Sequence, residues 1–171
     1  YIYTYIYNMS IKVAVRVRPF NTREEDTELI ISMKGNSTII KDEFGNEKTF
    51  TFDKSFWSHD QYIEQPNGYL SPTPGSPYAD QKIVFDALGK EILDNAWEGY
   101  NCCLFAYGQT GSGKSYSMVG YGANKGIVPI SCEEVFTRIK SNKDETITYE
   151  VEIGMLEIYN EKVQDLLVAA N

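Results

Sequence analysis

The sequence predicts an α/β fold in which a buried strand leads into a glycine-rich loop and then into a helix. Residues 102–106 form a short apolar run, as buried parallel strands do. Residues 108–115 are rich in glycine, and residues 115–118 are able to begin a helix. This order of elements indicates a domain built on a parallel sheet.

A helix is predicted over residues 80–98, immediately before that strand. Apolar side chains recur at helical spacing along it, with Asp80 placed to cap its start and Gly99 placed to end it. Such a helix would cover one face of the sheet as the crossover into the strand at residues 102–106.

The glycine-rich loop has the spacing Gly-x-x-x-x-Gly-Lys-Ser of a phosphate-binding loop, fixed here by Gly108, Gly113, Lys114 and Ser115. Glycines let the backbone N–H groups turn toward phosphate oxygens. Lys114 would bring a positive charge to the β- and γ-phosphates, and the Ser115 hydroxyl would bind Mg²⁺. A plain glycine/serine turn is the alternative, and the strand–loop–helix context disfavours it.

A second buried strand is expected over residues 11–17, which are rich in β-branched side chains and precede Pro19. Arg16 and Arg18 lie on one side of this strand because strand side chains alternate. Taken alone, two arginines at a strand end also fit a solvated edge.

The remaining segments give weaker patterns. The proline-rich residues 60–78 are expected to form a mobile surface loop without helix or strand. Ser71 and Thr73 each precede a proline there, so a proline-directed phosphorylation site is an alternative role. Short strands are expected over residues 29–40 and 48–56, an amphipathic helix over residues 129–141 and a long strand over residues 146–158.

Cysteine and histidine usage gives no metal site or disulfide framework. The three cysteines, Cys102, Cys103 and Cys132, are expected to be free buried thiols. The single histidine, His59, has no cluster of ligands around it in the sequence and is expected to be a loop residue.

Residues 106–115 closely resemble the phosphate loop of the kinesin motor domain, which characteristically has Tyr-Gly-Gln-Thr before its last glycines. Residues 12–20 are similar to the family's first strand with its Arg-x-Arg-Pro signature. Residues 98–101 and 156–161 also match in order and spacing. The resemblance covers residues 11 to about 167, and Trp57-Ser58-His59 is most similar to the cargo-transporting kinesin-three subfamily.

The resemblance implies a phosphate-loop NTPase of the kinesin motor type. Its fold would be a three-layer αβα arrangement around a mixed, mostly parallel sheet, present only as an incomplete N-terminal portion. Residues 9–171 are expected to be the N-terminal half of a motor domain that starts at Met9. Residues 1–8 are expected to be a non-native or disordered leader without function.

The resemblance also assigns a site for ATP and Mg²⁺. Lys114 is the expected catalytic residue, Ser115 the expected metal ligand, and Arg16, Arg18, Pro19 and Tyr116 the expected contacts of the adenine. An aromatic face at Tyr116 suits stacking on a purine. The expected phosphate contacts are Gly108, Gln109, Thr110, Gly111, Ser112, Gly113, Lys114 and Ser115.

The implied function is a microtubule motor that hydrolyses ATP, located in the cytoplasm on the microtubule cytoskeleton. Its expected partners are microtubules, through regions mostly absent here, and cargo adaptors. A nucleic-acid partner is not expected, because 24 acidic residues against 16 basic ones give a net charge of −8. Direct membrane insertion is not expected either, since the first residues do not form a signal peptide.

Two segments through which kinesins hydrolyse ATP are not found in these 171 residues. They read like Asn-x-x-Ser-Ser-Arg-Ser-His and Asp-Leu-Ala-Gly-Ser-Glu in the family. The isolated chain is therefore expected to be unstable and to have little or no ATPase activity. A kinesin-like microtubule-binding protein without hydrolysis is the alternative function. An unrelated nucleotide-binding protein with the same loop would leave the other matching segments unexplained.

Overall fold

The computed structural model describes residues 11–168, which fall into two units, residues 11–134 and 135–168. Each unit is described by itself. The leader expected over residues 1–8 lies outside the described residues.

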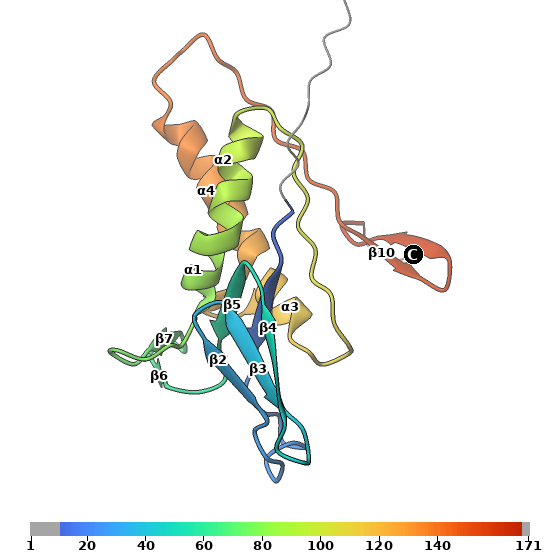
Figure 1. Ribbon diagram of the computed structural model, residues 1–171. Coiled ribbons are helices and arrows are strands. Elements are labelled where there is room, and N and C mark those ends of the chain that lie inside the picture. Colours follow the sequence, from blue (N-terminus) through green and yellow to red (C-terminus); the bar gives the residue numbers. More distant parts are fainter. Residues whose placement is uncertain (1–10, 169–171) are drawn as a thin grey trace, which may run out of the picture. The chain divides into compact units, whose positions relative to one another are not determined.

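The first unit is organised around a parallel pair of strands, β1 (Ala14–Val17) and β5 (Lys54–Trp57) (Figure 1). Their register runs from Ala14 opposite Lys54 to Val17 opposite Trp57. Just before β5, the Asp53 carboxylate accepts a hydrogen bond from the Val13 N–H at 2.7 Å, which aligns the starts of the two strands. The strand predicted over residues 11–17 is confirmed in its second half.

An antiparallel sheet joins β2 (Ile31–Lys34), β3 (Ser37–Lys41) and β4 (Glu47–Thr51). Gly35 turns the first hairpin with a φ of 58°. In the second hairpin the Asp42 carboxylate accepts hydrogen bonds from the backbone N–H groups of Phe44 and Asn46, which fixes the turn. The short strands expected over residues 29–40 and 48–56 are confirmed.

The predicted helix over residues 80–98 forms as α1 (Gln81–Val84), a π-helical turn η1 (Phe85–Gly89) and α2 (Lys90–Trp97). As predicted, Asp80 caps its start: its carboxylate accepts a hydrogen bond from the Ile83 N–H at 2.8 Å. Gly99 follows the end with a left-handed φ of 91°.

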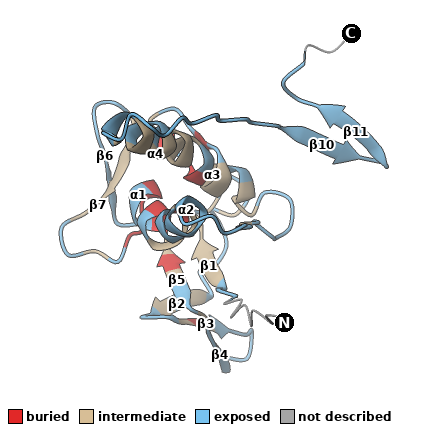
Figure 2. Ribbon diagram, turned by 90° about the horizontal axis from the view of Figure 1, so that it is seen from above, coloured by how far each residue is buried: buried red, intermediate tan, exposed pale blue. Residues whose placement is uncertain are grey.

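The buried core of the first unit is small. Figure 2 shows buried stretches in β5 and at the start of the helical segment. The apolar cluster consists of Phe56, Ala79, Val84, Phe85 and Ile127. Strand β5 thus packs against the helix that the sequence predicts over one face of the sheet.

The glycine-rich loop leads into α3 (Lys114–Met118), then into a short hairpin of β8 (Gly120–Tyr121) and β9 (Asn124–Lys125), and then into α4 (Ile127–Ser141). The helix expected from residue 129 therefore begins at Ile127. Gly120 has a φ of +76°, and a Cβ added to it would lie 1.9 Å from the Asn124 carbonyl oxygen. The hairpin closes directly on this glycine.

Gly120→Ala is expected to lower the free energy of unfolding by at least about 2 kcal/mol, because it adds both backbone strain and a clash with backbone atoms. Gly122→Ala is the matched control: its φ is +55°, but its Cβ would meet no atom within 4 Å. Urea unfolding of both variants checks this expectation. Equal losses in the two variants would show that crowding against Asn124 has no effect.

Residues 60–78 do contain strands, so the expectation of a loop without regular structure is wrong. Strand β6 (Tyr62–Glu64) pairs with β7 (Leu70–Pro72) in an antiparallel hairpin. The hairpin tolerates its prolines because Pro66 lies in the turn and Pro72 occupies the last paired position. Gly68 supplies the left-handed backbone that the turn requires, with a φ of 83°.

The strand predicted over residues 102–106 does not form, and this expectation is also corrected. Phe105 is 80% exposed. A strand needs a neighbour for its backbone groups, and no strand pairs with this segment within residues 11–168.

The expectation that the cysteines are buried is wrong as well, because two of them belong to the segment in which the predicted strand does not form. Cys102 and Cys103 are exposed and Cys132 is half-buried, although all three are free, as predicted. His59 lies outside the helices and strands, as expected, and packs against the rings of Phe20 and Trp57.

In the second unit the long strand expected over residues 146–158 is reduced to β10 (Leu156–Tyr159), which pairs with β11 (Lys162–Asp165). Asn160 and Glu161 form the turn, both with positive φ, as a two-residue hairpin turn requires. The helices within residues 11–168 lack the combination of length and apolar character that crossing a membrane demands.

Candidate functional site

The glycine-rich loop adopts a backbone that glycine alone accommodates easily. Gly108, Gly111 and Gly113 have φ values of 151°, 80° and 95°. A Cβ on Gly108 would lie 2.5 Å from the Ser112 hydroxyl oxygen. The Ser112 N–H donates to the Gln109 carbonyl at 3.1 Å and closes the loop. The glycines of the predicted motif are therefore required by geometry as well as by spacing.

The Lys114 ammonium folds back over this loop. It donates to the carbonyl oxygens of Gly108 and Gln109, both at 2.8 Å. An ammonium at this place would also reach phosphate oxygens bound to the same loop. The neighbouring Ser115 is exposed on the first turn of α3, so its hydroxyl oxygen is open to a hard cation, which prefers oxygen ligands. Thr110 is exposed at the tip of the loop.

Arg18 connects the end of β1 to the loop. Its Nε donates to the Gly111 carbonyl at 2.6 Å. Its two terminal nitrogens form a bidentate pair with the Glu24 carboxylate at 2.6 and 2.7 Å, and one also donates to the Pro19 carbonyl. The predicted residues Arg18 and Pro19 thus lie beside the phosphate-loop motif.

Arg16 is hydrogen-bonded to residues from several parts of the chain. Its guanidinium donates to four acceptors, which are the hydroxyls of Ser58 (2.8 Å) and Ser117 (3.0 Å), the Gln81 side-chain oxygen (2.7 Å) and the Ala79 carbonyl (3.3 Å). Burial lowers the pKa of Arg16 from its ordinary value. These acceptors compensate the burial of its charge.

Tyr116 completes the predicted set. The Arg16 guanidinium lies 5.2 Å from the centre of its ring, within cation–π range. The Tyr121 ring lies 6.2 Å away at a tilt of 31°. Burial raises the pKa of Tyr116 from its ordinary value, and it raises the pKa of Tyr69, which lies in the β6–β7 hairpin, to about 12.

The structure therefore brings the predicted phosphate and base residues together around β1, the loop and α3. It adds residues that the sequence did not single out, above all Gln81, Asn124 and Glu24. Glu24 belongs to the acidic run of residues 24–28, and such a run by itself indicates only a solvated surface. The only sign of the pairing in the sequence is that Glu24 follows Arg18 by six residues, just after the end of β1.

Glu24→Gln is expected to destabilise the fold at neutral pH but not in strong acid. The pairing with Arg18 lowers the pKa of Glu24 from 4.5 to about 2. A depressed pKa stabilises the fold above the ordinary value, and this stabilisation is lost as pH falls from about 4.5 toward 2. Urea unfolding of wild type and variant at pH 7 and at pH 2 tests this. A gap between the two proteins that is equal at both pH values would contradict it.

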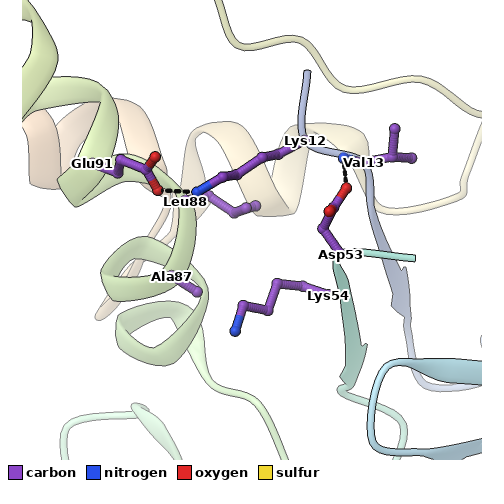
Figure 3. Close-up of a pocket in the computed structure, with 7 residues that line it drawn as sticks. All are labelled: Lys12, Val13, Asp53, Lys54, Ala87, Leu88 and Glu91. Carbon is purple, nitrogen blue, oxygen red and sulfur yellow. Dashed lines mark hydrogen bonds and ion pairs between the residues drawn. The ribbon is translucent and has the colours of Figure 1, made fainter. Parts of the chain in front are cut away.

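A cavity of about 390 Å³ lies apart from these residues. It is lined by Lys12, Val13, Asp53, Lys54, Ala87, Leu88 and Glu91 (Figure 3). Lys12 pairs with Glu91 there, and Asp53 is held by the Val13 N–H. Its lining includes none of the predicted site residues, so it is not the candidate nucleotide site.

Comparisons with known proteins give a consistent family. The model of the kinesin motor domain matches residues 16–171. The chain is 53% identical to the kinesin-like protein KIF28 of Rattus norvegicus over 163 residues, which is 92% of this chain and 16% of the relative. It is 46% identical to human KIF1C over 165 residues, 92% of this chain and 14% of that protein. KIF1C is a kinesin-three protein, in line with the resemblance at Trp57-Ser58-His59.

Solved structures agree. The chain is similar to a KIF14 dimer solved with AMP-PNP in complex with a microtubule, with a TM-score of 0.81 and 40% identity. The likeness covers 94% of this chain and 42% of that one. A second structure, of a fast kinesin, gives a TM-score of 0.74 and 33% identity, covering 92% of this chain and 41% of that one. These likenesses confirm the predicted fold class as an incomplete α/β portion with a parallel sheet.

The chain spans less than a fifth of the two curated relatives. The match to the family model nevertheless runs from Arg16, within β1, through the phosphate-loop motif and both hairpins that follow it. This chain belongs to the kinesin motor-domain family.

Proposed function

We propose that this chain binds ATP with Mg²⁺ and belongs to a protein that hydrolyses ATP to move along microtubules. The observation that carries the proposal is the Lys114 ammonium, held over a glycine loop by two loop carbonyls. The phosphate contacts would come from the loop at residues 108–115. Lys114 acts on the β- and γ-phosphates, and the Ser115 hydroxyl would hold Mg²⁺.

The base would be held on the other side of the loop. Arg16 and Tyr116 lie together there, and Arg18 joins Pro19 to Gly111. A purine stacks well on an aromatic ring, and an adjacent guanidinium adds a cation–π contact.

The motor role draws on the relatives. The KIF14 structures that resemble this chain are complexes with a microtubule, one with ADP and one with AMP-PNP. By that likeness the partners of this protein are microtubules, and its place in the cell is the cytoplasmic microtubule cytoskeleton. Cargo adaptors belong to the same proposal.

The test is microtubule-stimulated ATP hydrolysis by the full-length product of the gene that encodes this chain. Phosphate release that rises with microtubule concentration supports the motor function. Microtubule binding that responds to AMP-PNP and ADP, but without phosphate release, would favour the alternative of a non-hydrolysing microtubule-binding protein. Hydrolysis indifferent to microtubules would contradict both.

A further inference from the structure

Gln81 is a buried polar side chain whose amide is fully used between three elements. The residue is 2% exposed at the start of α1. Its oxygen accepts from Arg16, while its nitrogen donates to the carbonyls of Tyr116 at 2.6 Å and Asn124 at 3.1 Å. Gln81 therefore fixes the place of Arg16 and the backbone of Tyr116 at once.

Asn124 continues the same network toward the β6–β7 hairpin. It is 9% exposed, and its side-chain oxygen accepts from the Leu70 N–H at 2.8 Å. Its side-chain nitrogen donates to the Gly68 carbonyl, also at 2.8 Å. The side-chain amide of Asn124 thus bonds one backbone N–H and one backbone carbonyl of the hairpin.

These bonds form one chain from the hairpin through Asn124 and Gln81 to Arg16 and Tyr116. The two linking residues, Gln81 and Asn124, are buried, and removing one partner of such a bond leaves the other unsatisfied at a cost larger than the bond itself contributes. The hairpin is therefore joined by hydrogen bonds to the pair that the proposed function assigns to the base.

The phosphate-loop motif is held by different bonds. Lys114 contacts Gly108 and Gln109, and Arg18 contacts Gly111. Neither Gln81 nor Asn124 takes part in them. Arg16 and Tyr116 are therefore held by bonds other than those of the loop, while Arg18, another predicted base contact, is bonded to the loop itself.

We propose that Asn124 and Gln81 are positioning residues for the nucleobase, and that through them the β6–β7 hairpin controls affinity for the base but not for the phosphates. The inference rests on the proposed ATP site and names the part of the chain that tunes it. A change in the contact between the hairpin and Asn124 would then alter selection of the nucleotide while leaving the phosphate contacts intact.

The experiment compares two ligands on the full-length product: Mg·ATP and Mg·tripolyphosphate, which has phosphates but no base. Asn124→Ala is expected to weaken ATP binding about tenfold, since the two hydrogen bonds that join Asn124 to the hairpin are lost while the Gln81 bond to the Asn124 main-chain carbonyl is kept. Tripolyphosphate binding is expected to stay unchanged. Calorimetric titration measures both.

Asn67→Ala is the matched control within the same hairpin. The Asn67 side chain accepts from the Tyr69 N–H and supports the turn, without a bond to Asn124. This variant is expected to bind ATP and tripolyphosphate like wild type.

Hydrogen exchange on the wild-type protein gives a readout that needs no variant to fold. The Leu70 N–H donates to Asn124, so ATP is expected to slow its exchange more than tripolyphosphate does. Equal protection by both ligands would overturn the inference. So would an Asn124→Ala variant that binds ATP normally or loses both ligands equally, and in these cases the ATP site itself stands. Wild-type protein that binds neither ligand would overturn the proposed function together with the inference.

Discussion

Lys114→Ala is expected to weaken ATP binding by at least about a hundredfold, since the ammonium would make two charge-assisted bonds to phosphates, each worth about 1.5–3 kcal/mol. In the structure this ammonium already lies against the loop, bonded to Gly108 and Gln109. Binding would exchange these neutral carbonyl partners for anionic oxygens. Titration of the full-length variant with Mg·ATP measures the loss.

Lys54→Ala is the control for loss of a lysine elsewhere in the same unit. Lys54 lines the separate cavity, whose lining includes none of the loop residues (Figure 3). Its removal is expected to leave ATP affinity unchanged. Because Lys114 is bonded to a surface loop rather than to the core, its variant is expected to unfold at nearly the wild-type urea concentration. Normal ATP binding by Lys114→Ala would remove the basis of the proposed phosphate site.

Elements with a local cause were predicted well from the sequence. The helix after Asp80 begins where its carboxylate caps a backbone N–H, and the phosphate-loop motif turns at its glycines. Strand β1 ends before Pro19. Each of these depends on residues within a few positions of one another, which a sequence displays directly.

Elements that depend on a distant neighbour were predicted poorly. Residues 102–106 have the composition of a buried strand, yet a strand exists only beside a partner. In the opposite direction, residues 60–78 have the composition of a loop, yet the turn at Gly68 and the contacts of Asn124 fold them into a hairpin. The composition of a segment indicates which conformations it can adopt, but not which other segment of the chain it pairs with.

The residues of the candidate site show the same difference between those that the sequence singled out and those that it did not. Arg16 and Arg18 were found because strand spacing and family resemblance placed them on one side of β1. Gln81 and Asn124 were missed because an amide has no spacing signature: its role is set by the polar groups that surround it after folding. Residues proposed to contact a ligand are therefore more visible in a sequence than residues proposed to hold those contacts in place.

The polypeptide of 171 residues, produced alone, is expected to self-associate and to hydrolyse ATP at no more than about a hundredth of the rate of a complete motor, because the two segments with which kinesins hydrolyse ATP do not occur in these residues. The second unit exposes apolar side chains along a two-stranded hairpin, which is marginally stable by itself. Those more than 45% exposed include Ile153, Leu156, Ile158, Tyr159, Val163 and Leu167. Open strand edges with apolar faces favour association between copies.

This surface is testable at one cross-strand pair. Ile158 lies opposite Val163, and both are 67% exposed. Replacing them with Lys and Glu keeps a favourable cross-strand pair but removes two apolar side chains. The concentration for half-association is then expected to rise at least about tenfold, since burial of one such side chain contributes about 1.5–3 kcal/mol. Light scattering across a dilution series measures it, with Gln164→Glu, on the opposite face, as the control. A monomeric wild-type polypeptide at high concentration would contradict the expectation, because these side chains would then be stable in water without any partner.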